Sequence, residues 1–175
     1  MRTILLSVLF LFNLQTKPDS DFTLSKSHVG NIRLGMSINS LYQLYNRECF
    51  RLVDLQLEGQ FSPAIELSLG NDSSSVVTIE YTCRKSYWII DRISLYDKRF
   101  STAEGIRVGS TLGELRRNYK IDWIDFGETA LFARVDELGM SFALDISELG
   151  DGVYDLVKKN KLPDNIRIAF ILLTQ

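Results

Sequence analysis

The sequence predicts an α+β protein made of two tandem α-β-β-β units, with an antiparallel sheet and helices packed on one face. Two observations lead to this class: a helix-start pattern that occurs once in each half, and alternating apolar and polar residues after each copy. The composition supports a folded chain, because 45% of the 175 residues are hydrophobic and 24% are charged. Those proportions are ordinary for a folded soluble domain.

A matching segment opens each half. Residues 32–45 align without gaps on residues 106–119, an offset of 74 positions (106 minus 32). In both copies a glycine stands two positions before Ser37 or Thr111, and apolar residues then follow at helical spacing. Ser37 and Thr111 are therefore predicted helix N-caps, and Thr111 with Glu114 predicts a capping box. A short helix is expected at the start of each unit.

Alternation with a period of two follows each predicted helix, as in strands that bury one face. The predicted strands are residues 65–69, 77–83 and 87–96 in the first unit and 131–135, 140–146 and 166–173 in the second. One more short helix is predicted over residues 153–161. Strands joined by short turns pair mainly antiparallel, so we expect each helix to cover one face of the sheet.

The first residues have the pattern of a secretory signal. A positively charged start precedes a 12-residue apolar run at residues 3–14, which is shorter than the roughly 20 residues that a membrane-spanning helix needs. We predict residues 1–20 as a signal peptide, residues 21–97 as the first unit and residues 98–175 as the second, packed as one compact body. The alternative for the first segment is a buried N-terminal strand. The expected location is periplasmic or secreted, with no transmembrane segment after signal removal.

The chain has two cysteines, Cys49 and Cys83. Export would place both in an oxidising compartment, where a disulfide between them is possible. The alternative is two separate thiols that are buried as small hydrophobic side chains. The sequence leaves both open.

No assembled catalytic or cofactor site is recognisable. His28 is the single histidine, and it is distant in sequence from both cysteines, so typical zinc-ligand spacing is absent. Neither a phosphate-binding loop nor a dinucleotide fingerprint occurs. The net charge of -2, without a basic patch, argues against a nucleic-acid partner. We expect no catalytic residue, no metal and no cofactor.

Asp91 carries the main enzymatic alternative. It stands on an otherwise apolar predicted strand, and a buried carboxylate needs a partner or a function. A small carboxylate-dependent hydrolase has no fixed spacing of its acids and so remains possible. More often such an aspartate lies near a strand bulge and reaches solvent.

Aromatic and arginine residues indicate a binding surface. Trp88, Arg92 and Tyr96 alternate along the predicted strand 87–96, and Phe132 shares a side with Arg134 in the second unit. If helices cover only one face of the sheet, these side chains lie on the other face. Such residue types anchor protein interfaces. The alternative places Trp88 and Phe132 in a second buried layer between the units.

The repeated motif also carries a resemblance. The pattern Ile-x-Leu/Val-Gly-x-Ser/Thr-x-x-x-Leu, at residues 32–41 and 106–115, resembles the helix-then-sheet module of the beta-lactamase inhibitory protein and of small outer-membrane-assembly lipoproteins. The resemblance implies a protein-binding role through the face of the sheet. No cysteine precedes Cys49, so the lipoprotein anchor of the second group is not expected.

Together these observations predict an exported, non-enzymatic binding module. Its expected partner is another protein or a cell-envelope component, which it binds or inhibits through the sheet face. The alternatives are the carboxylate-dependent hydrolase and a cytoplasmic immunity-type inhibitor whose first residues are not a signal.

Overall fold

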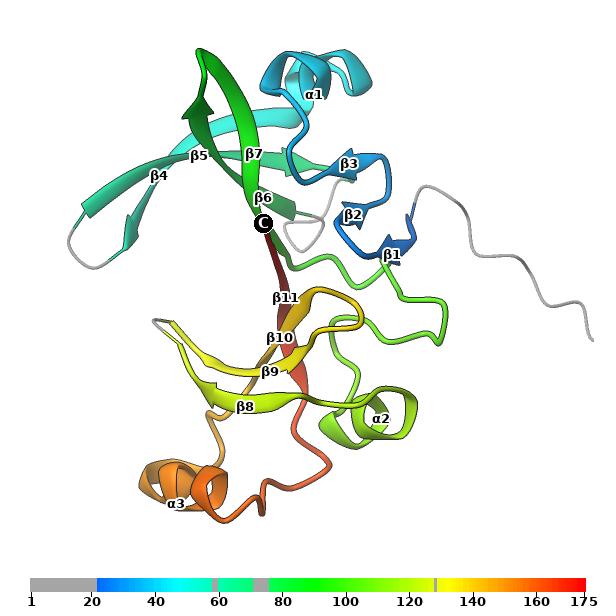
Figure 1. Ribbon diagram of the computed structural model, residues 1–175, viewed down its shortest axis with the longest axis vertical. Coiled ribbons are helices and arrows are strands. Elements are labelled where there is room, and N and C mark those ends of the chain that lie inside the picture. The colour runs from blue at the N-terminus through cyan, green and yellow to red at the C-terminus, as the bar shows by residue number, and fades with distance from the viewer. Residues whose placement is uncertain (1–21, 58–59, 71–75, 128) are drawn as a thin grey trace, which may run out of the picture.

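The structure is a computed structural model that describes residues 22–57, 60–70, 76–127 and 129–175 (Figure 1). The predicted signal peptide, residues 1–20, lies outside the described residues. Within the described ranges the α+β prediction is confirmed, since three α-helices accompany an eight-stranded antiparallel sheet and a separate three-stranded sheet.

The large sheet contains strands from both halves of the chain. Its strands are β4 (Phe50–Leu57), β5 (Gln60–Ser68), β6 (Val76–Arg84), β7 (Tyr87–Leu95), β8 (Trp123–Phe126), β9 (Leu131–Val135), β10 (Met140–Leu144) and β11 (Ile168–Thr174). Their order across the sheet is β4-β5-β6-β7-β11-β10-β9-β8. Each half therefore supplies four strands, one more than predicted, because β4 and β8 were not expected. β7 and β11 pair antiparallel at the centre, so an approximate two-fold axis relates the halves.

The helices begin where the sequence predicts them. They are α1 (Ile38–Leu44), α2 (Leu112–Asn118) and α3 (Val153–Lys158), with short 3-10 turns η2 (Arg47–Cys49) and η3 (Gly150–Gly152). The Ser37 hydroxyl accepts a hydrogen bond from the Ser40 N–H at 3.0 Å. Thr111 accepts one from the Glu114 N–H at 3.2 Å, and the Glu114 carboxylate accepts one from the Thr111 N–H at 2.7 Å. The capping box is confirmed.

The two helix lead-ins have the same backbone geometry. Gly35 and Gly109 adopt φ values of +79° and +89°, which favour glycine because a side chain there is strained. The Gly35 N–H donates to the Ile90 carbonyl at 2.8 Å, and the Gly109 N–H donates to the Ile168 carbonyl at the same distance. Each lead-in is thus attached to the central strand of its own half.

Both central strands carry a bulge at the matching position. Asp91 is the extra residue on β7, where the register with β6 shifts, and Ala169 is the extra residue on β11, where the register with β10 shifts. A bulge changes which face the following side chains point to. For this reason Ile90 and Ile93 are both buried on the same side of β7, although they are three residues apart.

The hydrophobic core lies between one face of the sheet and the helices α1 and α2. Leu41 of α1 and Leu115 of α2 are fully buried against sheet residues such as Ile79 and Phe142. In Figure 1 both helices lie on one side of the central strands, while the outer strands curve toward the other side. No helix of the described residues covers the opposite sheet face.

An unpredicted three-stranded sheet precedes α1. Its strands are β1 (Leu24–Ser25), β2 (His28–Val29) and β3 (Ile32–Arg33). The Leu24 N–H donates to the Ser101 carbonyl at 2.8 Å, which joins this first segment to the connection between β7 and α2. Leu24, Val29 and Ile32 are buried in the main core.

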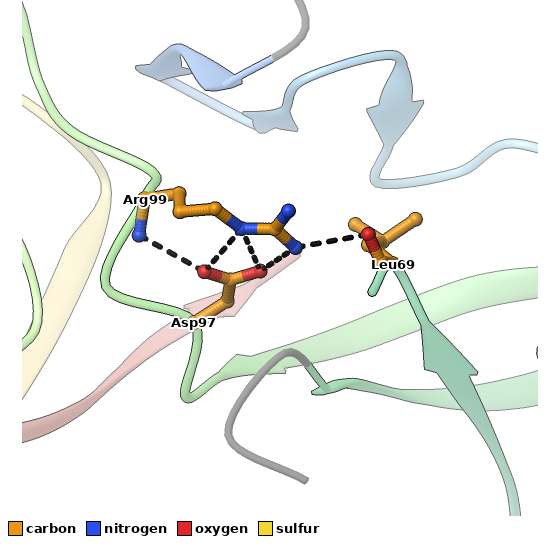
Figure 2. Close-up of polar contacts among 3 residues, drawn as sticks. All are labelled: Leu69, Asp97 and Arg99. Carbon is orange, nitrogen blue, oxygen red and sulfur yellow. Dashed lines mark hydrogen bonds and ion pairs between the residues drawn. The ribbon is translucent and has the colours of Figure 1, made fainter. Parts of the chain in front are cut away.

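The connection between the halves is fixed by a buried carboxylate (Figure 2). Asp97 is 2% exposed and accepts hydrogen bonds from the Arg99 N–H at 2.9 Å and from Arg99 Nε at 3.0 Å. The same guanidinium donates from Nη2 to the Leu69 carbonyl at 3.1 Å and lies over the Phe22 ring. The Arg99 side chain therefore joins the connection to the residue that follows β5 and to the first segment.

The considered disulfide is not formed, because Cys49 and Cys83 are both free. The strand register explains this result. Phe50, next to Cys49, pairs with Leu67, which pairs with Val77. Cys83 stands six residues farther along β6, roughly 20 Å away at about 3.3 Å per residue. A disulfide requires Cα atoms within about 7 Å.

Candidate binding groove on the open sheet face

The sheet face without helices forms a hollow of about 1330 Å³, which we call the open groove. All eight strands contribute to its lining. The lining includes Arg51, Glu66, Thr78, Glu80, Arg92, Ser94, Tyr96, Trp123, Phe132, Arg134, Ser141, Phe170 and Leu172. A concave surface of this size accommodates a segment of a partner, and its two ends differ in chemistry.

The part of the groove on β4 to β7 is polar, and its charges are paired. Arg51 forms an ion pair with Glu66 on the neighbouring strand. Arg92 lies 3.7 Å from Glu80, again across a strand pair. Oppositely charged neighbours of this kind stabilise a sheet by about 0.2 to 1 kcal/mol per pair. They also present both donors and acceptors to a ligand.

The other part is aromatic. The rings of Tyr96 and Phe170 are 5.2 Å apart, and the Phe132 ring meets Phe170 edge-on at 5.8 Å. Trp123, on the edge strand β8, is 48% exposed and lines the same part of the groove. Aromatic side chains therefore follow one another from the centre of the sheet to its edge. Such side chains contribute much of the binding energy in protein interfaces.

Arg134 stands beside the aromatic part. Its Nε donates to the Asp136 carboxylate at 2.8 Å, and its Nη1 lies 3.4 Å from the Ser141 hydroxyl. Trp123 is its direct cross-strand neighbour. The guanidinium is thus held in place at the rim of the aromatic surface.

Tyr96 links the two parts of the groove. Burial raises the pKa of its phenol above the ordinary value, and the nearby carboxylates of Glu80 and Glu66 raise the pKa further. The hydroxyl therefore keeps its proton at neutral pH and can donate a hydrogen bond to a ligand. The ring remains 43% exposed.

Four of the five predicted binding residues line the groove: Arg92, Tyr96, Phe132 and Arg134. Phe132 is only 7% exposed and forms part of the floor. Trp88 was expected on the same face as Arg92, and this expectation was wrong. The bulge at Asp91 separates the two residues, so Trp88 points to the helix-covered face.

Sequence reasoning missed Trp123 and Phe170 as groove residues. Trp123 lies on β8, which has four residues and only a brief alternation of Ile124 and Phe126 as a signal. Phe170 follows the bulge at Ala169, and nothing in the sequence marks that bulge.

Asp91 does not line the groove. It is the bulge residue of β7, and it accepts a hydrogen bond from Arg84 at 2.7 Å, with both side chains partly exposed. Among the described residues no group of three or more His, Cys, Asp or Glu side chains is arranged to hold a metal ion. In the same part of the chain, every helix is too short or too polar to cross a membrane.

Comparison with known proteins supports the fold. The chain matches no family model and no curated protein by sequence. It is similar in structure to the uncharacterized protein yfeY from Escherichia coli, with a TM-score of 0.56 and 12% sequence identity. The similarity covers 88% of this chain and 97% of that one. At this level of identity, the two proteins are shown to share a fold.

Proposed function

We propose that this protein is an exported, non-enzymatic binding module that engages another protein or a cell-envelope component through the open groove. The observation that carries the proposal is the row of Tyr96, Phe170, Phe132 and Trp123 on a concave face that none of the described helices covers. Tyr96 and Trp123 of this row are 43% and 48% exposed, and exposed apolar surface in a hollow marks an interaction site.

The chemistry of the groove supports protein recognition over small-molecule turnover. Its charged groups are arranged as ion pairs such as Arg51–Glu66 and Glu80–Arg92, and its lining from all eight strands suits an extended contact. A partner that places apolar side chains on the aromatic part and polar groups on the paired charges satisfies both parts. Interfaces of this kind combine an apolar centre with a polar rim.

Tandem duplication of one helix-and-sheet unit is part of the same proposal. The matching lead-ins at Gly35 and Gly109, together with the matching bulges at Asp91 and Ala169, support it. Duplication accounts for a continuous sheet wide enough to form the groove. The export signal proposed for residues 1–20 places the groove in the periplasm or outside the cell.

The test is affinity capture from the envelope fraction of the source cells, with quantitative comparison of variants. Tyr96→Ala and Trp123→Ala remove partly exposed groove side chains. Tyr154→Ala removes a ring outside the groove that is slightly more exposed, at 55%, and serves as the matched control. We expect one or more captured proteins to fall at least tenfold with the groove variants and to remain with the control.

Two outcomes contradict the proposal. If the groove variants and the Tyr154→Ala control capture the same proteins in the same amounts, the groove is not the binding surface. If mass spectrometry of the native protein finds Met1 intact, export by a cleaved signal is wrong, and the cytoplasmic inhibitor becomes the better description.

A further inference from the structure

A second exposed apolar surface lies on the helix-covered face of the sheet, on the strands of the first half. We call it the convex patch, and it consists of Leu52, Asp54, Phe61, Tyr81 and Trp88 on β4 to β7. Leu52 is 70%, Phe61 73% and Trp88 53% exposed. The Trp88 indole meets the Tyr81 ring edge-on at 5.5 Å. α1 does not extend far enough to cover these side chains.

Three of the five patch positions have apolar counterparts in the second half that are covered. Tyr81 and Leu144 occupy corresponding positions, because Tyr81 pairs with Ile90 and Leu144 pairs with Ile168. The carbonyls of these two isoleucines accept the hydrogen bonds from Gly35 and Gly109. Counting along the strands from these pairs, Leu52, Tyr81 and Trp88 correspond to Ile124, Leu144 and Ile166. Leu144 is 3% and Ile166 is 6% exposed, and Ile124 packs against the core.

The difference between the halves is α3. Between β10 and β11 the chain forms this helix, which packs Val153, Leu156 and Val157 against the core and stacks Tyr154 on Phe126 of β8 at 6.2 Å. In the first half, β6 and β7 are joined only by a tight turn. Figure 1 shows α3 next to β8, whereas among the described residues the connection between β6 and β7 contains no helix.

The charge of the convex patch also differs from that of its counterpart. Asp54 occupies the position of Phe126, and within the described part of the chain its carboxylate makes no ion pair. The phenol of Tyr81 has its pKa raised by burial and by the neighbouring Tyr42 and Asp54, so these polar groups lie close together. An unpaired carboxylate within an aromatic surface favours a positively charged side chain of a partner. Such a side chain can form an ion pair with the carboxylate and a cation–π contact with an aromatic ring.

We propose that the convex patch binds an amphipathic α-helix of a partner protein, in the place that α3 occupies in the second half. The bound helix presents apolar residues at the spacing of Val153, Leu156 and Val157. It carries Lys or Arg where α3 has Tyr154, so that this cation meets Asp54. Recognition of a short helix through residues at i, i+3 and i+4 is a recurrent binding mode. The site is separate from the open groove.

The test uses a lactam-stapled peptide of residues 149–161 with Tyr154→Arg, titrated into the full-length protein by calorimetry. The control peptide carries Tyr154→Glu. We expect the Arg peptide to bind at least fivefold more tightly than the Glu peptide. Asp54→Asn should weaken binding of the Arg peptide about three- to fivefold, as for a partly exposed ion pair. Trp88→Ala should weaken it at least tenfold, and Tyr87→Ala, an adjacent ring on the other sheet face, should leave it unchanged.

Leu52→Lys keeps the proposal testable if Trp88→Ala is unstable, because Leu52 is largely exposed and its replacement leaves no cavity. It should also abolish binding of the Arg peptide. The proposal is overturned if neither peptide binds at 1 mM or if both bind equally. A second titration uses vesicles of phosphatidylglycerol and phosphatidylethanolamine. A Trp88-dependent fluorescence shift with vesicles, without peptide binding, would assign the patch to a membrane surface instead.

Discussion

The most informative perturbation of the fold is Arg99→Ala. It leaves the Asp97 carboxylate, 2% exposed, with the backbone N–H of residue 99 as its one remaining donor within the described part of the chain. Removing one partner of a buried ion pair costs about 3 to 5 kcal/mol. Because the Arg99 side chain is itself 38% exposed, the lower end of this range applies. Loss of the contact with the Phe22 ring adds about 0.5 kcal/mol.

We therefore expect Arg99→Ala to lower the free energy of unfolding by about 3 to 4 kcal/mol. For a domain of about 150 residues, this corresponds to a fall in Tm of roughly 10 °C. Urea unfolding measures the free energy of unfolding and thermal unfolding measures Tm, each followed by circular dichroism. Asp97→Ala should cost less, about 2 kcal/mol, because the freed guanidinium can turn to water.

The matched control is Arg84→Ala, which breaks an ion pair of similar length to Asp91 at an exposed position. It should cost less than 1 kcal/mol. The double variant Asp97→Ala, Arg99→Ala should be no less stable than Arg99→Ala, since no unpaired charge remains. If Arg99→Ala is as stable as Arg84→Ala, the reasoning about the buried carboxylate is refuted.

Three further predictions follow from the described geometry. Gly35→Ala and Gly109→Ala should each lower the free energy of unfolding in urea by about 1 to 2 kcal/mol, because both residues have a left-handed backbone. A loss of stability at one position alone would contradict the equivalence of the lead-ins. Hydrogen bonds from the Thr111 backbone N–H and, to a smaller extent, from its hydroxyl hold the pKa of the Glu114 carboxyl below 4.5. The ionised carboxylate therefore stabilises the fold fully above its ordinary pKa. This contribution decreases as pH falls through the lowered pKa of the folded state. The stability difference between wild type and Glu114→Gln should therefore be constant from pH 7 to about 5 and shrink below pH 4.5; a difference that grows in acid would contradict the capping-box bond. Glu80→Gln should lower the pKa of the Tyr96 phenol in an NMR titration, and an unchanged value would show that this carboxylate does not act on the groove.

The elements that could be predicted from the sequence are those with local signals. The N-caps at Ser37 and Thr111 are readable because a short polar side chain and an apolar period occur together. The inner strands alternate clearly because one of their faces is buried. β4 was missed because its sequence, Phe-Arg-Leu-Val-Asp-Leu-Gln-Leu, is apolar on both faces near an uncovered edge. β8 was missed because four residues are too few to establish a period.

The sequence predicts a binding surface of aromatic and arginine side chains on the sheet, but it does not predict all of the residues that line the groove. Alternation places side chains on a face only while the register is unbroken, and the bulge at Asp91 is a tertiary feature without a sequence signal. For this reason Tyr96 and Arg92 were placed correctly relative to each other, whereas Trp88 was assigned to the wrong face. The same effect on β11 concealed Phe170.

The central position of β11 has a consequence for how the chain folds. β7 lacks its second neighbour until the chain has passed through all of the other described elements. Until then, strands β4 to β7 have an unpaired edge on β7, which later becomes the middle of the sheet. An unpaired edge can form hydrogen bonds with strands of other chains. Early-formed intermediates should therefore be prone to aggregation, and chaperone binding during biogenesis would protect this edge in particular.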